Sequence, residues 1–340
     1  MTHPTLADLG WSDHFARQCG PEPRAARISA VHRDRLQVLS PDGPLSLVPR
    51  GHAGGYAVGD FVLHDGVLAL ERLAPQTEIA RRAAGTGAAR QLIAANVDTL
   101  AIVTSCNADF NAARLERYLA VAEAAGCLPL VVLTKADLVD DPRDWVRRAQ
   151  RLSPLVTALA LDARDPEEAR RLDAWAGPGQ TLALTGSSGT GKTTLLNALT
   201  GAAEATRGIR EDDAKGRHTT THRALRRALA GGWIIDTPGM RELALTEAAE
   251  GIDAVFADLA DLETRCRFSD CRHETEPGCA VRAALDAGEI DADRLARWEK
   301  LRREERRNTK TLAEAHARDR AFGKMVRTVM RDKRDRGLKG

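Results

Sequence analysis

GSSGTGKTT, residues 186–194, is the stretch that decides the fold of this chain. It fits the phosphate-loop pattern of a glycine, four residues, then Gly-Lys and a Ser or Thr. Residues 180–185 (QTLALT) predict a strand before it, and residues 194–199 (TLLNAL) predict a helix after it. In that setting the glycines turn backbone N–H groups towards phosphate, and the helix N-terminus adds favourable partial charge. The stretch therefore predicts a nucleoside triphosphate site, with an ordinary glycine-rich turn as the alternative.

The residues of this loop are the candidate phosphate ligands. We expect Lys192 to reach the β- and γ-phosphates and the Thr193 hydroxyl to hold Mg²⁺. The full candidate set is Gly186, Ser187, Ser188, Gly189, Thr190, Gly191, Lys192, Thr193 and Thr194.

A second motif follows the apolar run 128–134 (LPLVVLT), which predicts a buried strand. It consists of Thr134, Lys135, Ala136 and Asp137. A carboxylate at Asp137 accepts hydrogen bonds from both N1–H and the 2-amino group of guanine, whereas adenine offers neither donor there and leaves the carboxylate unpaired. The Lys135 stem is expected to pack along the base. The motif predicts a guanine site; the alternative is a strand end followed by an Asp cap.

The run 232–236 (GWIID) predicts the last strand, and Asp236-Thr237-Pro238-Gly239 follows it as a second switch. We expect Asp236 to hold the Mg²⁺ shell through water and the Gly239 N–H to contact the γ-phosphate. The alternative is a strand that ends in a Pro-Gly turn.

The polar segment 208–221 is where a first switch is expected, with Thr219, Thr220 or Thr221 capping Mg²⁺ and the γ-phosphate. The residue after Gly239 is Met240, which cannot orient water as the Gln of many GTPases does. His218 is the local candidate for that role, with a surface histidine as the alternative.

From Leu92 onward, predicted strands alternate with predicted helices, which favours a parallel sheet covered by helices on both faces. Strands are expected at 98–105, 128–134 and 155–161, and helices at 112–125, 142–152 and 166–176. The guanine motif precedes the phosphate loop, the reverse of the usual order in GTPases. The chain is therefore expected to be circularly permuted, with the old ends joined near 162–180. A weak equivalent of the Ser-Ala guanine loop is expected near 157–163.

The regions before residue 75 and after residue 245 have sequence patterns that differ from this alternation. Short alternating runs between Arg27 and Ala74 predict a small five-stranded barrel of the OB type, in which Tyr56 and Phe61 are expected in the core. Near the other end stand Cys266, Cys271, His273 and Cys279. Three thiolates and one imidazole at these spacings predict a closed, tetrahedral, structural zinc site, with free core cysteines as the alternative.

Composition narrows the class of protein. The 340 residues carry a net charge of +2, yet from Arg294 to Gly340 Lys and Arg outnumber Asp and Glu by 17 to 7. This basic tail predicts a polyanion partner, with a solvated helix as the alternative. No apolar run is long enough for a transmembrane helix and no secretory signal is visible, so we expect a cytoplasmic protein with no membrane partner.

The motifs together resemble one family, the circularly permuted RsgA (YjeQ) GTPases of small ribosomal subunit biogenesis. The resemblance covers about residues 27–287 and rests on AANVDTLAIVTS, FNAARLERYL, VVLTKADL, GSSGTGKTTLLNAL, KGRHTTT, IIDTPGMREL and CRFSDCRHETEPGCAV. It implies an OB-fold, a permuted α/β P-loop GTPase and a C-terminal zinc domain. It also implies ribosome-stimulated GTP hydrolysis and binding to the ribosomal RNA of the small subunit. The chain departs from the family pattern at Thr190, Thr193 and the Ser-Ala loop.

We therefore expect a multidomain protein that hydrolyses GTP to GDP with Mg²⁺ and carries one structural Zn²⁺. The expected divisions are a lead-in (1–24), an OB-fold (25–74), a linker (75–91), the permuted GTPase (92–245) and a mostly helical zinc domain with a basic tail (246–340). It is expected to act as a monomer on the small subunit, with other assembly factors, and to couple hydrolysis to release or a checkpoint. The alternatives are a GTP-dependent RNA-binding switch with incidental hydrolysis, and a P-loop ATPase or kinase.

Overall fold

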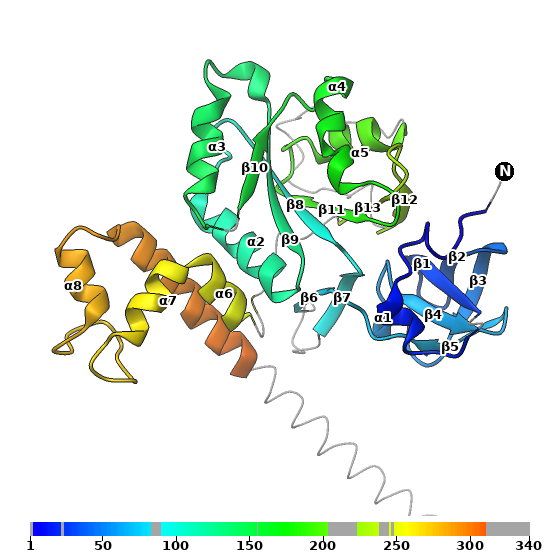
Figure 1. Ribbon diagram of the computed structural model, residues 1–340, viewed down its shortest axis with the longest axis horizontal. Helices are drawn as coiled ribbons and strands as arrows, with labels where there is room; N and C mark the ends of the chain where they lie inside the picture. The colour runs from blue at the N-terminus through cyan, green and yellow to red at the C-terminus, as the bar shows by residue number, and fades with distance from the viewer. Residues whose placement is uncertain are drawn as a thin grey trace, which may run out of the picture.

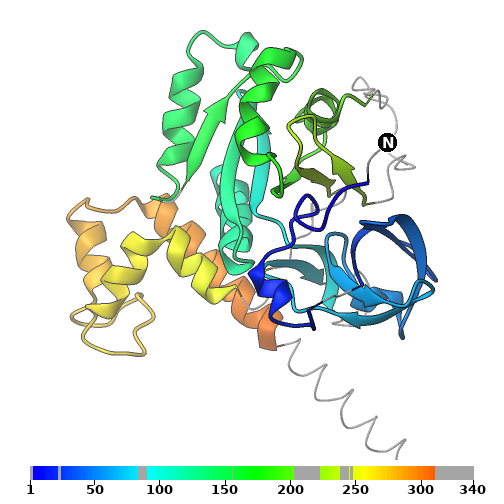
Figure 2. The ribbon, with the colours of Figure 1, turned by 45° about the vertical axis from the view of Figure 1, so that its right-hand side comes forward.

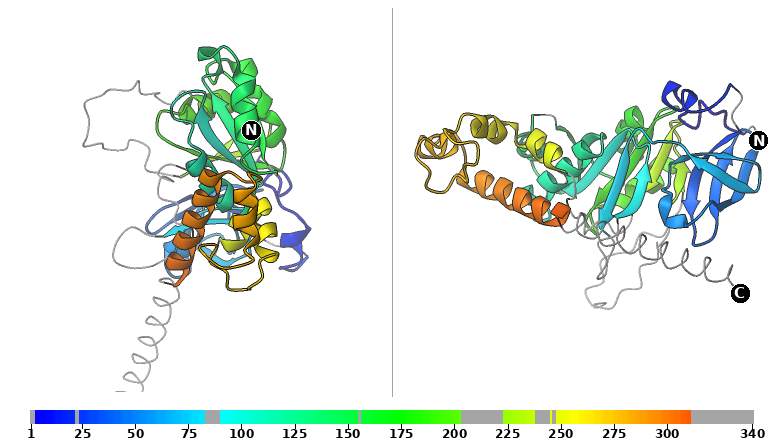
Figure 3. Two further views of the ribbon diagram at one scale, coloured as in Figure 1. Left: turned by 90° about the vertical axis from the view of Figure 1, so that its left-hand side faces the viewer. Right: turned by 90° about the horizontal axis from the view of Figure 1, so that it is seen from below.

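The computed structural model describes residues 3–21, 24–82, 90–154, 156–202, 223–237, 245 and 248–310. Along its longest axis the chain forms a barrel at one end, a central sheet with helices, and a group of helices at the other end (Figure 1; Figure 3, right). This arrangement agrees with the predicted fold class. Within the described ranges, no helix has the length and apolar character needed to cross a membrane.

The N-terminal barrel is closed, with strand order β1-β2-β3-β5-β4. Its strands are β1 (Ala25–Val31), β2 (Leu36–Ser40), β3 (Gly43–Pro49), β4 (Phe61–His64) and β5 (Leu68–Arg72), with the short 3₁₀ helix η1 (Ala53–Gly55) after β3. All pairs are antiparallel except β3 with β5, which is the pairing of an OB-fold. Apolar side chains at alternate positions fill the interior, and Tyr56 and Phe61 are buried as predicted.

The segment before the barrel is packed, although its composition suggested a polar lead-in. It contains the short helix α1 (Asp13–Ala16), and Leu9 and Phe15 are fully buried. The rings of Phe15 and Phe61 lie 4.6 Å apart, and Trp11 meets Phe61 edge-on at 5.2 Å. Figure 2 shows this dark-blue segment running between the barrel and the central sheet.

Arg27 joins the segment, the barrel and the central sheet. Its guanidinium is buried and donates to the carbonyl oxygens of Leu9 (2.7 Å), Gly59 (3.2 Å) and Asn96 (2.9 Å) and to Thr181 Oγ1 (2.8 Å). Burial lowers the pKa of Arg27 to about 10, so the side chain stays charged at neutral pH. Each of the three guanidinium nitrogens therefore has at least one acceptor, and a buried cation is tolerated only when its donors are paired in this way.

The segment 75–91, expected to be a linker, contains regular structure. Strand β6 (Glu78–Arg82) pairs antiparallel with β7 (Arg90–Ala95) in a two-stranded sheet of its own. A parallel bridge between Val58 and Ala94 ties this hairpin to the barrel. Charged residues obscured the strand pattern, because three of the five residues of β6 are charged and β7 begins with an arginine.

The central sheet has six strands in the order β10-β9-β8-β11-β13-β12. They are β8 (Thr99–Ser105), β9 (Leu128–Thr134), β10 (Thr157–Ala160), β11 (Thr181–Gly186), β12 (Leu225–Arg227) and β13 (Trp233–Asp236). Five are parallel as predicted, but β12 is an antiparallel edge strand that the sequence analysis missed. Buried side chains line both faces of the sheet in two separate core clusters, so helices cover it on both sides.

One face carries α2 (Ala112–Ala124) and α3 (Pro142–Gln150), and the other carries α4 (Pro166–Ala169), η3 (Arg170–Trp175) and α5 (Lys192–Thr200) (Figure 1). Asn111 and Asp141 cap the N-termini of α2 and α3 with their side-chain oxygens. The helix predicted at 166–176 is divided into two elements, the single α-helical turn α4 and the 3₁₀ helix η3.

The C-terminal helices are α6 (Ala249–Val255), α7 (Ala257–Thr264), α8 (Ala280–Asp286) and a helix over residues 292–310. Helix α6 packs against α2, where Gly251 lies so close to the Ala120 carbonyl that a Cβ would come within 2.2 Å of its oxygen. Figure 3 (left) shows α6 and the 292–310 helix lying side by side.

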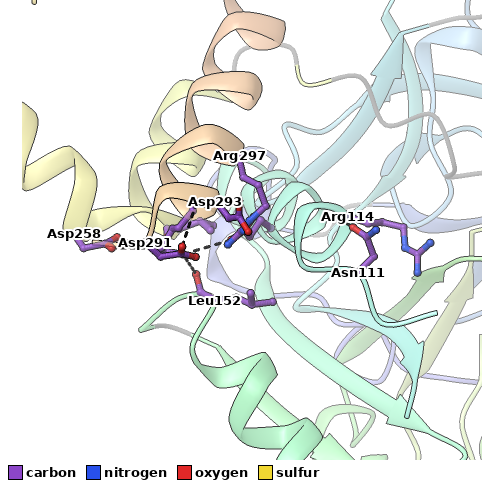
Figure 4. Close-up of polar contacts among 10 residues, drawn as sticks. Asn111, Arg114, Leu152, Asp258, Asp291, Asp293 and Arg297 are labelled. Carbon is purple, nitrogen blue, oxygen red and sulfur yellow. Dashed lines mark hydrogen bonds and ion pairs between the residues drawn. The ribbon is translucent and has the colours of Figure 1, made fainter. Parts of the chain in front are cut away.

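A buried ion cluster fixes the 292–310 helix to α2 (Figure 4). Glu116 of α2 is fully buried and accepts from Arg297 Nε at 2.7 Å. Arg294 pairs with Asp258 of α7 at 2.7 Å and donates to the Leu152 carbonyl after α3 at 3.0 Å. Burial raises the pKa of Glu116, which the two arginines oppose. The junction therefore joins three parts of the chain through matched charges.

Candidate functional site

The phosphate loop is built by β11 and the start of α5. Gly186 ends β11 with φ of +137°, and a Cβ there would lie 2.0 Å from the Val103 carbonyl oxygen, so only glycine fits between these strands. Gly191 has φ of +88° and leads directly into α5. The Lys192 ammonium and the Thr190 hydroxyl both donate to the Ser187 carbonyl, the latter at 2.9 Å. The predicted strand, glycine turn and helix are all present.

Thr134 links this loop to the second motif. Its Oγ1 contacts the Thr190 carbonyl oxygen at 2.7 Å and the Thr104 carbonyl oxygen at 3.0 Å. The side chain is 1% exposed, so water does not compete for these bonds. Strand β8 lies between β9 and β11 in the sheet. The Thr134 hydroxyl at the end of β9 therefore reaches past the end of β8 to the loop that follows β11. The two sequence motifs therefore form one site.

Asp137 lies just beyond β9, in the 3₁₀ helix η2 (Ala136–Leu138). Lys135 precedes it with φ of +59°, a left-handed conformation that costs a non-glycine residue about 1–2 kcal/mol. Arg164, in the loop after β10, donates from Nη2 to Asp137 Oδ2 at 2.6 Å. The Ala136 N–H also meets the Leu161 carbonyl at 3.3 Å. Residues 161–164, near the expected position of the Ser-Ala loop, thus lie beside Asp137.

Asp236 ends β13, the neighbour of β11 on the side away from β8. It stands opposite Leu184 in the parallel register, two residues before the phosphate loop. Thr237 Oγ1 donates to the Leu184 carbonyl at 2.7 Å and holds the end of β13 against β11. Thr193, in the first turn of α5, and Asp236, at the end of β13, therefore belong to neighbouring elements, and hydroxyl and carboxylate oxygens are the donor type that Mg²⁺ prefers.

The remaining switch residues lie outside the described residues. These are His218, Thr219, Thr220, Thr221 and Gly239. Their predicted roles stay predictions.

The predicted zinc ligands converge. Their ligand atoms all lie within 4.8 Å of one another. Cys266 Sγ is 3.9 Å from Cys279 Sγ and 3.7 Å from His273 Nδ1, and Cys279 Sγ is 3.4 Å from His273 Nδ1. Metal bonds of about 2.3 Å to sulfur and 2.0 Å to nitrogen in tetrahedral geometry place ligand atoms about 3.5–3.8 Å apart. These three residues, together with Cys271, therefore fit a tetrahedral Zn²⁺.

A carboxylate outside the cluster, that of Glu263, orients the imidazole of His273. His273 has φ of +62°, and its Nε2 lies 3.4 Å from Glu263 Oε1 of α7. The other oxygen of Glu263 pairs with Arg302 of the 292–310 helix. A carboxylate on the far nitrogen fixes the tautomer of a zinc-binding histidine and strengthens it as a ligand. This chain of contacts connects the zinc loop to the last described helix.

Two of these neighbours escaped the sequence analysis. Arg164 and Glu263 belong to no motif, and each reaches its partner across a loop or between helices. The position of Arg164 directly after a strand of the parallel sheet was the one available signal, because such loops gather at the ligand-binding edge.

Known proteins of one family are similar to this chain over most of its length. A family profile described as RsgA GTPase matches residues 72–246. The small ribosomal subunit biogenesis GTPase RsgA of Mesorhizobium japonicum is 52% identical over 317 residues, covering 90% of this chain and 91% of that protein. The small ribosomal subunit biogenesis GTPase RsgA 2 of Vibrio parahaemolyticus is 44% identical and covers 98% and 95%.

Two solved structures share the architecture. The crystal structure of YjeQ from Thermotoga maritima has a TM-score of 0.60 at 25% identity and covers 82% of this chain and 97% of that chain. The structure of YloQ, a circularly permuted GTPase, has a TM-score of 0.56 at 22% identity, covers 88% and 96%, and supports the fold. With half the chain matched by the profile and a relative at 52% identity over nine-tenths of it, this protein belongs to the RsgA GTPase family.

Proposed function

We propose that this protein hydrolyses GTP during maturation of the small ribosomal subunit. The observation that carries the proposal is the hydrogen bond from Thr134 to the Thr190 carbonyl, which joins a guanine-reading motif to a phosphate loop at one edge of the sheet. The names of the relatives supply the ribosomal subunit as the setting. The alternative of an ATPase or kinase leaves the Asp137 motif without a purpose.

In the proposed site, Asp137 accepts from guanine, and the Lys135 stem covers the base. The loop N–H groups and Lys192 surround the β- and γ-phosphates. Thr193 and Asp236 hold Mg²⁺, which neutralises charge on the phosphate oxygens. The switch residues predicted from the sequence complete the proposal. His218 orients water, one of Thr219, Thr220 and Thr221 reaches Mg²⁺ and the γ-phosphate, and the Gly239 N–H contacts the γ-phosphate.

We assign a structural role to the zinc cluster. Cys266, Cys271, His273 and Cys279 use all four tetrahedral positions, which leaves none for a reacting water. Bound Zn²⁺ would hold residues 266–279 as a compact loop between α7 and α8. The domain divisions stay as proposed from the sequence, with helix 292–310 belonging to the zinc-containing part.

Ribosomal RNA is the proposed polyanion partner. The described end of the basic tail carries Lys300, Arg303 and Arg307 around one surface hollow, together with Glu304. Such clusters of exposed cations bind phosphate backbones with a strong dependence on salt. We further propose that the protein acts in the cytoplasm as a monomer, alongside other assembly factors, and that hydrolysis controls its release from the subunit or a checkpoint.

The test is GTP turnover by the full chain alone, with purified small subunits and with purified large subunits. We expect a low rate alone, since Met240 cannot orient water, and a large rise with small subunits only. Lys192→Ala should lower the stimulated rate by about 100-fold or more, because it removes a cation from the γ-phosphate. A competition between GTP and ATP in the same assay checks the base.

Equal turnover with and without small subunits would contradict the proposal. Binding of Lys192→Ala to small subunits, measured by co-sedimentation, separates the two roles of the nucleotide. If the variant binds and leaves the subunit as the wild type does, hydrolysis is incidental and the protein is an RNA-binding switch.

A further inference from the structure

The ion pair between Arg164 and Asp137 has no place in the roles assigned so far. Arg164 Nη2 donates to Asp137 Oδ2 at 2.6 Å. Asp162 holds the same guanidinium through Nε and Nη2, each at 3.2 Å, and accepts the Arg164 backbone N–H at 2.9 Å. Two carboxylates therefore fix this arginine against the residue that the proposed function gives to guanine.

Guanine and Arg164 need the same acceptor. Guanine presents N1–H and its 2-amino group side by side, and the pair occupies both oxygens of one carboxylate. Arg164 Nη2 occupies Oδ2 with a donor of the same kind and carries no acceptor. A base bound in this way faces the guanidinium donor against donor across one carboxylate, and the repulsion between these N–H groups makes the base and the arginine compete for Asp137.

We infer that Arg164 is a specificity-determining residue that competes with guanine for Asp137. The inference rests on the proposed function. Each guanine that binds must weaken or displace this ion pair, so Arg164 lowers the affinity for GTP and GDP. It also weakens discrimination, because Asp137 keeps Arg164 as a partner when a base without the two donors, such as adenine, occupies the site.

The size of the effect follows from exposure. The Arg164 side chain is 69% exposed and that of Asp137 is 26% exposed. Ion pairs this accessible are weak, and breaking one changes a binding constant by about 1.5- to 5-fold. Removal of Arg164 should therefore tighten GDP binding by that factor. The difference from the wild type should shrink as salt rises from about 0.05 to 0.5 M, because salt screens exposed pairs.

Calorimetric titration of the full chain with GDP and with ADP tests the inference. Arg164→Ala should bind GDP more tightly and ADP no more tightly than the wild type, so the GDP-to-ADP ratio rises. Arg170→Ala is the matched control, since Arg170 is 62% exposed and pairs with Glu167 and Asp173 instead. That variant should bind both nucleotides as the wild type does.

A second titration shows whether the effect passes through Asp137. In Asp137→Asn, the side chain no longer attracts a cation and offers an N–H donor suited to the 2-oxo group of xanthine. Arg164→Ala in that background should change the affinity for xanthosine diphosphate by less than about 1.5-fold, the lower limit for an exposed pair. Equal tightening in both backgrounds would overturn the inference.

Weaker GDP binding by Arg164→Ala would also overturn it, and would mean that the arginine contacts the bound nucleotide. Such a result in a protein whose wild type binds GDP leaves the proposed function intact. A wild type that binds neither GDP nor GTP would instead remove the proposed function and this inference with it.

Discussion

At the scale of single residues, the Thr134 hydroxyl has the clearest measurable effect. Thr134→Val keeps the shape of the side chain but removes the donor to the Thr190 carbonyl. A net hydrogen bond of about 0.5–1.5 kcal/mol corresponds to a loss of about 2- to 12-fold, which we expect in GDP affinity. Thr134→Ser, which restores the donor, should recover most of it. If Thr134→Val unfolds more easily yet binds GDP normally, the bond supports only the fold.

The residues predicted from sequence and those missed differ in one physical respect. The motif Thr134–Asp137 and the phosphate loop owe their function to local backbone geometry, which residues close in sequence determine. Arg164 and Glu263 act on partners fixed by tertiary packing, and a single sequence contains no spacing rule for such pairs. The structure brings the guanine and phosphate motifs together, and the roles of the switch threonines stay predictions.

At the scale of elements, strands were predicted where apolar runs were unbroken. Strand β9 (Leu128–Thr134) matches its prediction at both ends. Strand β12 and the β6–β7 hairpin were missed because their arginines interrupt the apolar pattern, although an edge strand or a separate hairpin tolerates charge. Strand β12 also has only three residues, too few to show a periodicity.

The zinc loop allows a prediction about thiol reactivity. The six cysteines are all free of disulfides. Burial raises the pKa of Cys106 to about 11 and that of Cys127 to about 12, so both stay protonated and unreactive at pH 8. We expect a chromogenic disulfide to modify one thiol, Cys19, in the zinc-bound protein. Chelation should release one zinc per chain and expose three more.

Zinc release measured with a metal-binding dye provides the second readout of that experiment. Glu263→Gln should speed the release, since it replaces the carboxylate on His273 with a weaker partner. Four reactive thiols before chelation, or an unchanged thiol count after it, would show that these cysteines hold no metal.

At the scale of the whole molecule, the junction between α2 and the 292–310 helix predicts a response to pH. Arg117 donates two hydrogen bonds of 2.5 Å to Glu304, and these bonds hold the pKa of that carboxyl below its ordinary value of 4.5. A depressed pKa means that the pair stabilises the fold above pH 4.5 and loses its effect as pH falls below it.

Glu304→Gln should therefore lower the melting temperature by about 1–3 °C at pH 7, the effect of one partly exposed pair in a protein of this size. The gap between wild type and variant should close as pH falls below 4.5. Comparing the two proteins at each pH cancels the loss of zinc, which affects both. A gap that stays constant or widens in acid would mean that the charge of Glu304 does not stabilise this junction.

The contacts of residues 8–10 have a consequence for synthesis. The Asp8 carbonyl accepts from Trp233 Nε1 at 2.7 Å, the Leu9 carbonyl accepts from Arg27, and Gly10 lies against Gly179. Asp8 thus has a partner, Trp233, that is synthesised 225 residues later. A nascent chain of 200 residues already contains every barrel strand but lacks Trp233, so the bond between Trp233 and Asp8 forms only after synthesis has passed residue 233. The contact between residues 8 and 233 is therefore among the last that synthesis allows this segment to make.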